Sequence, residues 1–483
     1  MLKLPTLFAK SAIVLLLLPH MAIASDTLPA SLQAVMAKTA TPSSAMAILV
    51  RPVDGGPAVL EHASTVAMSP ASTMKLLTTV IALEELGPTY RWKTQFLSAA
   101  NIKKDRLRGD LYLRGGGAPD VSWDRLALML RSLRDSGIRE IGGNIVLDRS
   151  HFQPSRFDLG LAPFDETPDA YYNVIPDALM VESNLTQFAI ESDARRFKVR
   201  LSPPMANMRL DNQLKLIDAP CDQWETKWQA PVAHTSRTYK TTIKLSGDFP
   251  RHCKITTALN TLDRNVYIEQ LIRRLWQEMG GTWRGHVLDG QVVENAKVLV
   301  ERQSDTLADN IKLVNKRSDN MMARLLYLSL GTNFVDAKNY STSFLAAEAH
   351  VRQWFEQHQI SHEGLVLDNG SGLSRSERIS AQQMASLLQV AAGSNWFPEL
   401  SSSLPIVAVD GTMRRRLKGS AAEARARIKT GTLRDAVAVA GYVRDVHNRW
   451  WIVVAMVNQA QASQSRPVLD EVINWVANGA VPN

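Results

Sequence analysis

The pattern of apolar and polar positions predicts a strand followed by a helix near the beginning of the chain. Residues 46–50 form a short apolar run of the kind found in buried strands. From residue 70 onward, apolar side chains recur at helical spacing as far as Leu83. Ser69 is expected to cap this helix, and Gly87 is expected to end it.

The last part of the chain predicts a pair of strands and a final helix. Residues 437–443 and 450–457 are rich in valine and are separated by a polar turn, which favours two neighbouring strands. Residues 468–477 are amphipathic at helical spacing and would pack as a helix on that sheet.

The middle of the chain, about residues 88–290, has a pattern more typical of β structure. It shows short alternating strands, turns rich in glycine and proline, and one clear helix at about 264–279. A length of 483 residues suits two or three domains. We therefore expect an α/β domain interrupted by a large insertion of one or two mainly β domains. The expected division is residues 25–87 and 291–483 for the α/β domain, 88–150 and 256–290 for a second domain, and 151–255 for a third module.

The N-terminus predicts export. Lys3 and Lys10 precede an apolar run at residues 12–18, and a small-x-small sequence ends at Ala24. This order is typical of a signal peptide, here residues 1–24. The apolar run is far shorter than the roughly 20 residues that cross a bilayer. We expect cleavage after about Ala24 and at most loose membrane association of the mature protein.

Composition narrows the class of protein. The chain is 45% hydrophobic and 21% charged, as in globular proteins. Without Lys3 and Lys10, its net charge of +8 becomes +6, which favours polyanionic surroundings. Two cysteines exclude a disulfide-rich scaffold or a cysteine-rich zinc array. In an exported protein Cys221 and Cys253 are candidates for a disulfide, and two separate buried thiols are the alternative.

The first motif that carries chemistry is Ser72-Thr73-Met74-Lys75. Three residues of separation on a helix place Ser72 and Lys75 on one face, within reach of each other. Desolvation or nearby positive charge can lower the pKa of a lysine amine until it acts as a base. A serine and a lysine facing solvent would give the same spacing, so this motif alone is weak.

Two further motifs follow. Ser318 and Asn320 stand at the start of a predicted helix, where an ordinary helix cap is the simpler interpretation of that pair alone. Lys429-Thr430-Gly431-Thr432 is expected to open the strand that continues through 437–443. Lysine offers a charge and threonine offers hydroxyls for a carboxylate, while glycine lets a ligand approach the backbone closely. The simpler alternative for this motif is a charged strand entry.

The three motifs together, in this order, match the signature of penicillin-recognising serine enzymes. The separation of 243 positions from Lys75 to Ser318 leaves room for the large insertion. Over nearly the whole mature chain the sequence resembles the low-molecular-mass class C penicillin-binding proteins, including the run at 369–375. It departs from the usual family residues at Asn369, where aspartate is frequent, and at Thr432, where serine is frequent.

This resemblance implies a transpeptidase/β-lactamase-like catalytic domain with D-alanyl-D-alanine carboxypeptidase and endopeptidase activity on peptidoglycan in the periplasm. It implies inhibition by β-lactams and no metal, cofactor or nucleic-acid partner. The implied roles are Ser72 as nucleophile, Lys75 as base, Ser318 as proton relay, Asn320 as a contact to the substrate backbone, and Lys429, Thr430, Gly431 and Thr432 as the carboxylate site. The backbone N–H groups of Ser72 and Thr432 would form the oxyanion hole.

Three alternatives stay open. A serine β-lactamase shares the three motifs, although no Glu-x-x-x-Asn segment resembles its usual deacylating loop. A murein-binding protein without catalysis would not need all four reactive side chains. Asp165 is a candidate for binding a substrate amine, but an ordinary surface carboxylate is the simpler interpretation.

Overall fold

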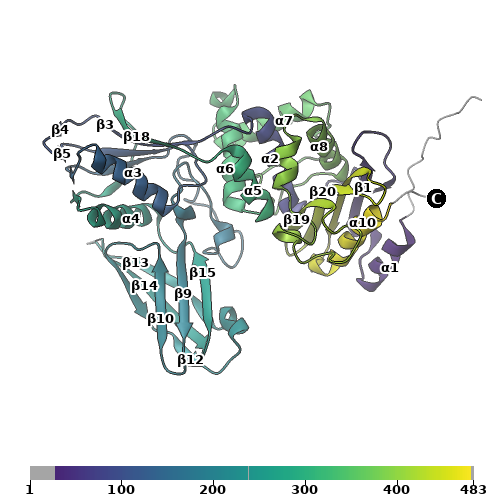
Figure 1. Cartoon of the computed structure of the whole chain (residues 1–483), viewed down its shortest axis with the longest axis horizontal. Helices are drawn as coiled ribbons and strands as arrows, with labels where there is room; N and C mark the ends of the chain where they lie inside the picture. Colours follow the sequence, from purple (N-terminus) through teal and green to yellow (C-terminus); the bar gives the residue numbers. More distant parts are fainter. Residues whose placement is uncertain (1–27, 238, 480–483) are drawn as a thin grey trace, which may run out of the picture.

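The computed structural model describes residues 28–237 and 239–479, which form an elongated molecule of three parts (Figure 1). The expected signal peptide lies outside the described residues. The first part is built on a five-stranded antiparallel sheet, and its strand order is β19-β20-β21-β1-β2. The strands are β1 (Met46–Pro52), β2 (Leu60–His62), β19 (Ala426–Thr432), β20 (Ala436–Arg444) and β21 (Trp450–Asn458).

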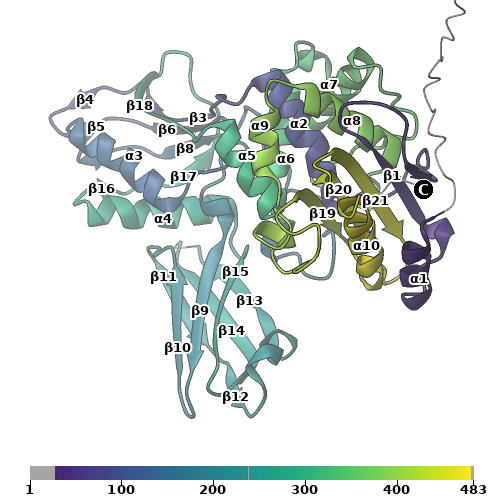
Figure 2. The same cartoon turned by 45° about the vertical axis from the view of Figure 1, so that its right-hand side comes forward.

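Alternation along the strands divides the side chains of this sheet between two buried faces. In β1, Ala47 and Leu49 pack on one face, whereas Met46, Ile48 and Val50 pack on the other. The terminal helices α1 (Ala30–Lys38) and α10 (Arg466–Ala477) cover the second face. The first face is covered by α2 (Lys75–Leu86) and α8 (Ala381–Gly393), with further helices α5 (Leu307–Lys316), α6 (Asn320–Asn333), α7 (Ser343–Gln357) and α9 (Phe397–Ser403) around them (Figure 2).

The second part contains a five-stranded sheet of order β17-β8-β6-β3-β18 and a smaller sheet of order β16-β7-β5-β4. Helices α3 (Trp123–Asp135) and α4 (Arg264–Glu278) pack against these sheets. The sequence pattern predicted α4 and missed α3. The strands are β3 (Lys93–Ser98), β4 (Ile102–Lys103), β5 (Arg106–Leu107), β6 (Leu111–Gly115), β7 (Glu140–Ile141), β8 (Ile145–Asp148), β16 (Thr282–Trp283), β17 (Val287–Asp289) and β18 (Lys297–Gln303).

The pairing of β18 with β3 corrects one expected boundary. The sequence pattern predicts that the chain re-enters the first part at residue 291, which would place residues 297–303 in that part. They instead form an edge strand of the second part, hydrogen-bonded along residues 93–98. The chain therefore returns to the first part at about α5 rather than at residue 291.

The third part is a β module of two small sheets that extends away from the second part (Figure 2). Its core contains Phe188, Ile190, Ile243, Leu245 and Phe249, and a disulfide joins Cys221 to Cys253. The strands are β9 (Thr186–Ser192), β10 (Phe197–Ser202), β11 (Met208–Asn212), β12 (Lys215–Ile217), β13 (Trp228–Thr235), β14 (Thr241–Pro250) and β15 (Lys254–Leu259).

Apart from an isolated bridge between Ala170 and Leu259, residues 151–185 lie outside the sheets of this module, although the sequence pattern groups them with it. All of them are described, and their only regular elements are two short 3-10 turns, Tyr171–Asn173 and Glu182–Asn184. Phe152, Phe157 and Val174 pack with the apolar face of α6 in the first part. This segment is therefore held against the helix that begins at Asn320.

The architecture confirms the expected α/β fold with mainly β insertions. Within residues 28–237 and 239–479, no helix has the length and apolar character that crossing a bilayer requires.

Candidate active site

Ser72 lies in a 3-10 turn (Ala71–Met74) that leads directly into α2. The chain enters this turn through Ala71, whose φ of 45° is in the left-handed region. The expectation that Ser69 caps the helix is wrong. The Ser69 backbone instead pairs with the side-chain amide of Asn458 on β21, through bonds of 2.7 and 3.0 Å. The turn carrying Ser72 is thereby tied to the C-terminal end of β21, the middle strand of the five-stranded sheet.

Lys75 is fully buried, and its Nζ lies within hydrogen-bonding distance of three oxygens. These are Ser72 Oγ at 3.1 Å, Asn320 Oδ1 at 2.6 Å and the carbonyl oxygen of Ser371 at 2.5 Å. The oxygens of Asn320 and Ser371 can only accept. A neutral amine has two N–H groups and one lone pair. When its two N–H groups donate to the oxygens of Asn320 and Ser371, its lone pair faces the hydroxyl of Ser72.

The surroundings of Lys75 favour that neutral form. Burial lowers the pKa of Lys75 to about 7, against the opposing influence of the carboxylates of Asp319 and Glu377. The positive charge of Arg324 acts in the same direction as burial. A large fraction of Lys75 is therefore unprotonated near neutral pH.

The Ser318–Asn320 motif and the Lys429–Thr432 motif meet beside this pair. Asp319, rather than Ser318 or Asn320, caps α6 by accepting from the backbone N–H of Met322 at 2.9 Å. The Nζ of Lys429 donates to Ser318 Oγ at 2.8 Å and to the backbone carbonyl oxygen of Thr430 at 2.9 Å. Burial, and then the charge of Lys75, lower the pKa of Lys429 well below its usual value.

The sequence pattern predicts that the Lys429–Thr432 motif opens the strand through 437–443, and this prediction is wrong. The motif instead forms the end of β19. β19 and β20 are separate strands of a hairpin, and Lys429 lies opposite Ala440. An ideal Cβ on Gly431 would lie 2.5 Å from the carbonyl oxygen of Pro70 and 2.9 Å from the backbone nitrogen of Ser72. Glycine is therefore required for β19 to lie this close to Ser72.

A buried carboxylate organises the loop that contacts Lys75. The carboxylate of Glu377 accepts from the backbone N–H groups of Asn369, Gly370 and Gly372 at 3.0, 2.7 and 2.8 Å. Burial raises the pKa of Glu377 despite these bonds. The loop it fixes includes Ser371, whose carbonyl oxygen accepts from Lys75. Nothing in the sequence pattern singled out this residue.

Ser72, Ser318, Asn320 and Thr432 open into a cavity of about 1250 Å³. Its wall also includes three arginines and an acidic loop: Arg375, Arg378, Arg434, Phe164, Asp165, Glu166, Tyr171 and Tyr172. Partial burial raises the pKa of Asp165, but hydrogen bonds from Thr167, Asn173 and Tyr172 outweigh it and lower the pKa overall. Asp165 is therefore an ionised group in the wall of the cavity.

Across residues 28–237 and 239–479, the histidine, cysteine, aspartate and glutamate side chains form no group of three or more that could hold a metal ion. The cavity wall carries serine, threonine, asparagine, glutamine, tyrosine and arginine side chains together with the carboxylates of the acidic loop.

Comparison with known proteins identifies the family of the chain. The sequence pattern of the D-Ala-D-Ala carboxypeptidase 3 (S13) family matches residues 28–479. The chain is 29% identical over 389 residues to a D-alanyl-D-alanine carboxypeptidase of Actinomadura sp., covering 77% of this chain and 70% of that protein. It is 27% identical over 413 residues to D-alanyl-D-alanine carboxypeptidase DacB of Haemophilus influenzae, covering 83% and 82%.

The fold is also similar to solved structures. Penicillin binding protein 4 of Haemophilus influenzae superimposes with a TM-score of 0.78 at 22% identity, covering 92% of this chain and 99% of that one. The same protein complexed with a β-lactam gives a TM-score of 0.73 at 21% identity, covering 93% and 98%. With the family pattern spanning nearly all of the described residues, the chain belongs to the D-Ala-D-Ala carboxypeptidase 3 (S13) family of serine peptidases.

Proposed function

We propose that this chain cleaves D-alanyl-D-alanine bonds in peptidoglycan stem peptides and D-centred cross-links through an acyl-enzyme on Ser72. The observation that carries the proposal is the position of Lys75. Its two acceptor-only neighbours, Asn320 Oδ1 and the Ser371 carbonyl oxygen, leave the lone pair of the neutral amine directed at Ser72 Oγ, 3.1 Å away. This is the geometry of a nucleophile beside its general base.

Acylation follows from that geometry. Lys75 takes the proton of Ser72 while Oγ forms a bond to the carbonyl carbon of the penultimate D-alanine. The backbone N–H groups of Ser72 and Thr432 stabilise the developing oxyanion. The C–N bond then breaks as Ser318, held by Lys429, passes its proton to the leaving amine and receives in its place the proton that Lys75 took from Ser72. Water finally hydrolyses the ester and releases the shortened peptide.

The carboxylate beside the scissile bond supplies the recognition. Lys429, Thr430 and Thr432 lie at the end of β19 and offer an amine and two hydroxyls to it. A terminal D-alanine and the D-centre of a cross-linking diamino acid both carry a carboxylate at this position. One site can therefore trim stem peptides and cut cross-links. The ionised carboxylate of Asp165 suits an amine on the substrate side chain.

We also propose that the mature protein works in the periplasm after cleavage near Ala24, with at most loose attachment to the membrane. The support is the charged, apolar and small-x-small order of residues 1–24 and the net charge of +8 for the whole chain. Peptidoglycan is then the substrate within reach.

Intact-mass measurement after brief exposure to benzylpenicillin tests the proposal, with Ser72→Ala as the matched control. We expect one adduct per chain that maps to Ser72, persists for minutes and is absent from the variant. Intact drug without an adduct would leave a murein-binding protein. Consumed drug without an adduct would indicate a β-lactamase. Release of D-alanine from a pentapeptide and cleavage of a cross-linked dimer then compare the two peptidase activities.

A further inference from the structure

We propose that Arg264, which lies in the inserted second part and does not face the cavity, is a positioning residue for the catalytic centre. It acts through residues 172–177, a segment we call the strap, whose backbone sets the orientation of the Asn320 side chain. The inference rests on the proposed roles of Ser72 and Lys75.

The orientation of the Asn320 amide decides where the lone pair of Lys75 points. Asn320 Nδ2 donates to the carbonyl oxygen of Tyr172 at 3.0 Å, while its Oδ1 accepts from Lys75. A backbone carbonyl can only accept, so the amide must turn its NH₂ group toward Tyr172 and its oxygen toward Lys75. With the amide reversed, Nδ2 would donate to the lone pair that is needed for the proton of Ser72.

Three successive side-chain donors fix the strap. Besides the bond from Asn320 to Tyr172, Arg324 Nη1 donates to the carbonyl oxygen of Val174 at 3.0 Å, and Arg264 Nη2 donates to that of Ile175. Asn320 and Arg324 belong to α6, whereas Arg264 is the first residue of α4 in the second part. The strap is therefore held between two parts of the molecule.

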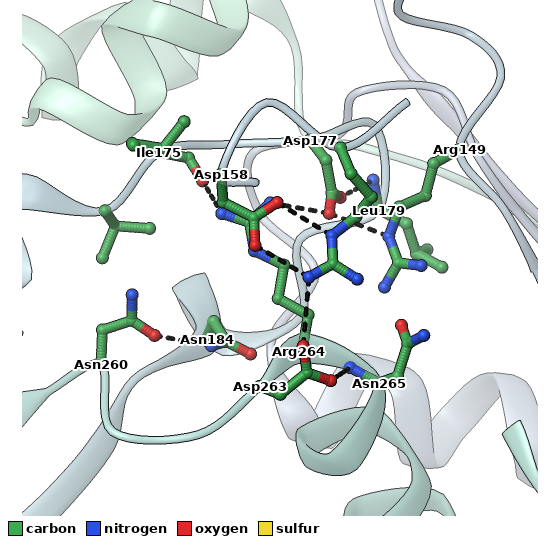
Figure 3. Close-up of polar contacts among 12 residues, drawn as sticks. Arg149, Asp158, Ile175, Asp177, Leu179, Asn184, Asn260, Asp263, Arg264 and Asn265 are labelled. Carbon is green, nitrogen blue, oxygen red and sulfur yellow. Dashed lines mark hydrogen bonds and ion pairs between the residues drawn. The ribbon is translucent and has the colours of Figure 1, made fainter. Parts of the chain in front are cut away.

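The end of the strap is anchored by a buried ion pair. The carboxylate of Asp177 is fully buried between the guanidinium groups of Arg264 and Arg149, each 2.8 Å from Oδ2 (Figure 3). Its Oδ1 accepts from the backbone N–H of Leu179 at 2.7 Å. Side chains of Arg149 and Arg264 are 1% and 4% exposed. Because removing one partner leaves a buried charge uncompensated, this anchor strongly resists displacement of the strap.

Lys75 itself is surrounded by charged groups, of which Arg324 also donates to the strap. Asp319 and Glu377 favour its charged form, Arg324 and burial oppose it, and Lys429 interacts with it as a like charge. A change at Arg264 thus reaches Lys75 by moving the Tyr172 carbonyl and freeing the Asn320 amide. Loss of the Oδ1 acceptor weakens the stabilisation of the ammonium form and moves the pKa of Lys75 downward.

The test compares Arg264→Lys with Arg156→Lys in the mature full-length protein. Arg156 belongs to the same ion cluster through Asp158 and Asp263, but it makes no hydrogen bond or ion pair to the strap in the described contacts. The readout is the rate constant of benzylpenicillin acylation at saturation, measured by quenched intact mass from pH 5 to 9 and normalised to the fraction of chains that become acylated.

We expect Arg264→Lys to lower the plateau of the acylation rate about tenfold or more, because small displacements of a catalytic group are costly. The midpoint of the pH–rate profile should move to lower pH, because the pKa of Lys75 falls. Arg156→Lys should change the rate by less than about twofold. Equal rates in both variants, accompanied by a shared fall in melting temperature, would show that the cluster is only structural and would overturn the inference. Acylation of the wild-type protein tests the proposed function separately.

A double-mutant cycle identifies the route. In an Asn320→Ala background there is no amide to orient, so adding Arg264→Lys should change the rate by less than about twofold. A full loss in that background would mean that Arg264 acts by another path and would overturn the inference. Asp177→Asn, which keeps the shape of the side chain, replaces Arg264→Lys in the cycle should that variant fail to fold.

Discussion

Lys429 Nζ donates a hydrogen bond to Ser318 Oγ across 2.8 Å, joining two motifs that are 111 residues apart in the chain. Ser318 has a φ of 59°, so its backbone is in the left-handed region directly before α6. With this backbone conformation, immediately before the Asp319 cap of α6, the Ser318 hydroxyl contacts Lys429 on β19. In the proposed mechanism, the leaving amine meets this hydroxyl, whose own partner is a buried lysine.

Removing that hydroxyl should slow acylation regardless of the backbone. Ser318→Gly and Ser318→Ala both delete it, but glycine adopts a positive φ more readily. We expect both variants to lower the acylation rate by about 10²-fold, the size of a lost proton-transfer group. Thermal melting should show Ser318→Gly to be the more stable of the two. A rate that followed stability instead would assign Ser318 a purely conformational role.

Acylation should depend on pH through Lys75. Burial lowers its pKa to about 7, and the base must be neutral, so the rate should rise with pH through a midpoint near 7 and then level off. The measurement is the benzylpenicillin acylation rate from pH 5 to 9. In Lys75→Met, which fills the same space without an amine, the residual rate should lose this limb. A midpoint near the ordinary lysine pKa would contradict the role of the buried amine as base.

Gly431→Ala should disable the site more than it destabilises the fold. The added Cβ would meet the Pro70 carbonyl oxygen and the Ser72 nitrogen, so β19 and the nucleophile turn must separate. A displacement of this size is expected to cost about 10²-fold in acylation rate. Gly393→Ala is the control, because its Cβ would have no neighbour within 4 Å. Wild-type acylation by Gly431→Ala would show that the close approach is dispensable.

Glu377→Gln should weaken both stability and catalysis. The glutamate carboxylate accepts three backbone N–H bonds, whereas a glutamine side chain has only one oxygen and brings an NH₂ donor toward them. We expect a loss of about 2–3 kcal/mol in the free energy of unfolding and a lower acylation rate, because the Ser371 carbonyl oxygen moves away from Lys75. Denaturant titration and acylation kinetics measure these effects.

The exposed Glu363 provides the matched control for that substitution. Its side chain lies on the surface, so Glu363→Gln should leave the free energy of unfolding within about 0.5 kcal/mol of the wild type. If the two glutamine variants behaved alike, the buried carboxylate would have no special role in holding the loop.

The disulfide should stabilise the third module without affecting the catalytic site. The bond closes a separation of 32 residues and Cys253 is buried in the core of that module. Replacing both cysteines by alanine should cost about 3–4 kcal/mol of unfolding free energy in the module. The rate of benzylpenicillin acylation should stay within about twofold of the wild type, because no catalytic side chain packs in that core. A parallel loss of acylation would reveal coupling between the module and the site.

The sequence by itself determined the local parts of this protein. Ser72 and Lys75 are three residues apart, so helical geometry alone brings their side chains together. The valine-rich segments at 437–443 and 450–457 likewise predict their strands from local periodicity. The order of the three motifs and the long gap after Lys75 were enough to indicate the family and its large insertion.

Only the tertiary structure decided how distant groups tune that pair. Asn320 contacts Lys75 across 245 residues of sequence, Ser371 across 296, and Arg264 reaches the strap across 89. Sequence periodicity reports which face of an element is buried, but not which element it meets or which way an amide turns. Those choices depend on satisfying buried polar groups in three dimensions, where each donor must find an acceptor once the whole chain has folded.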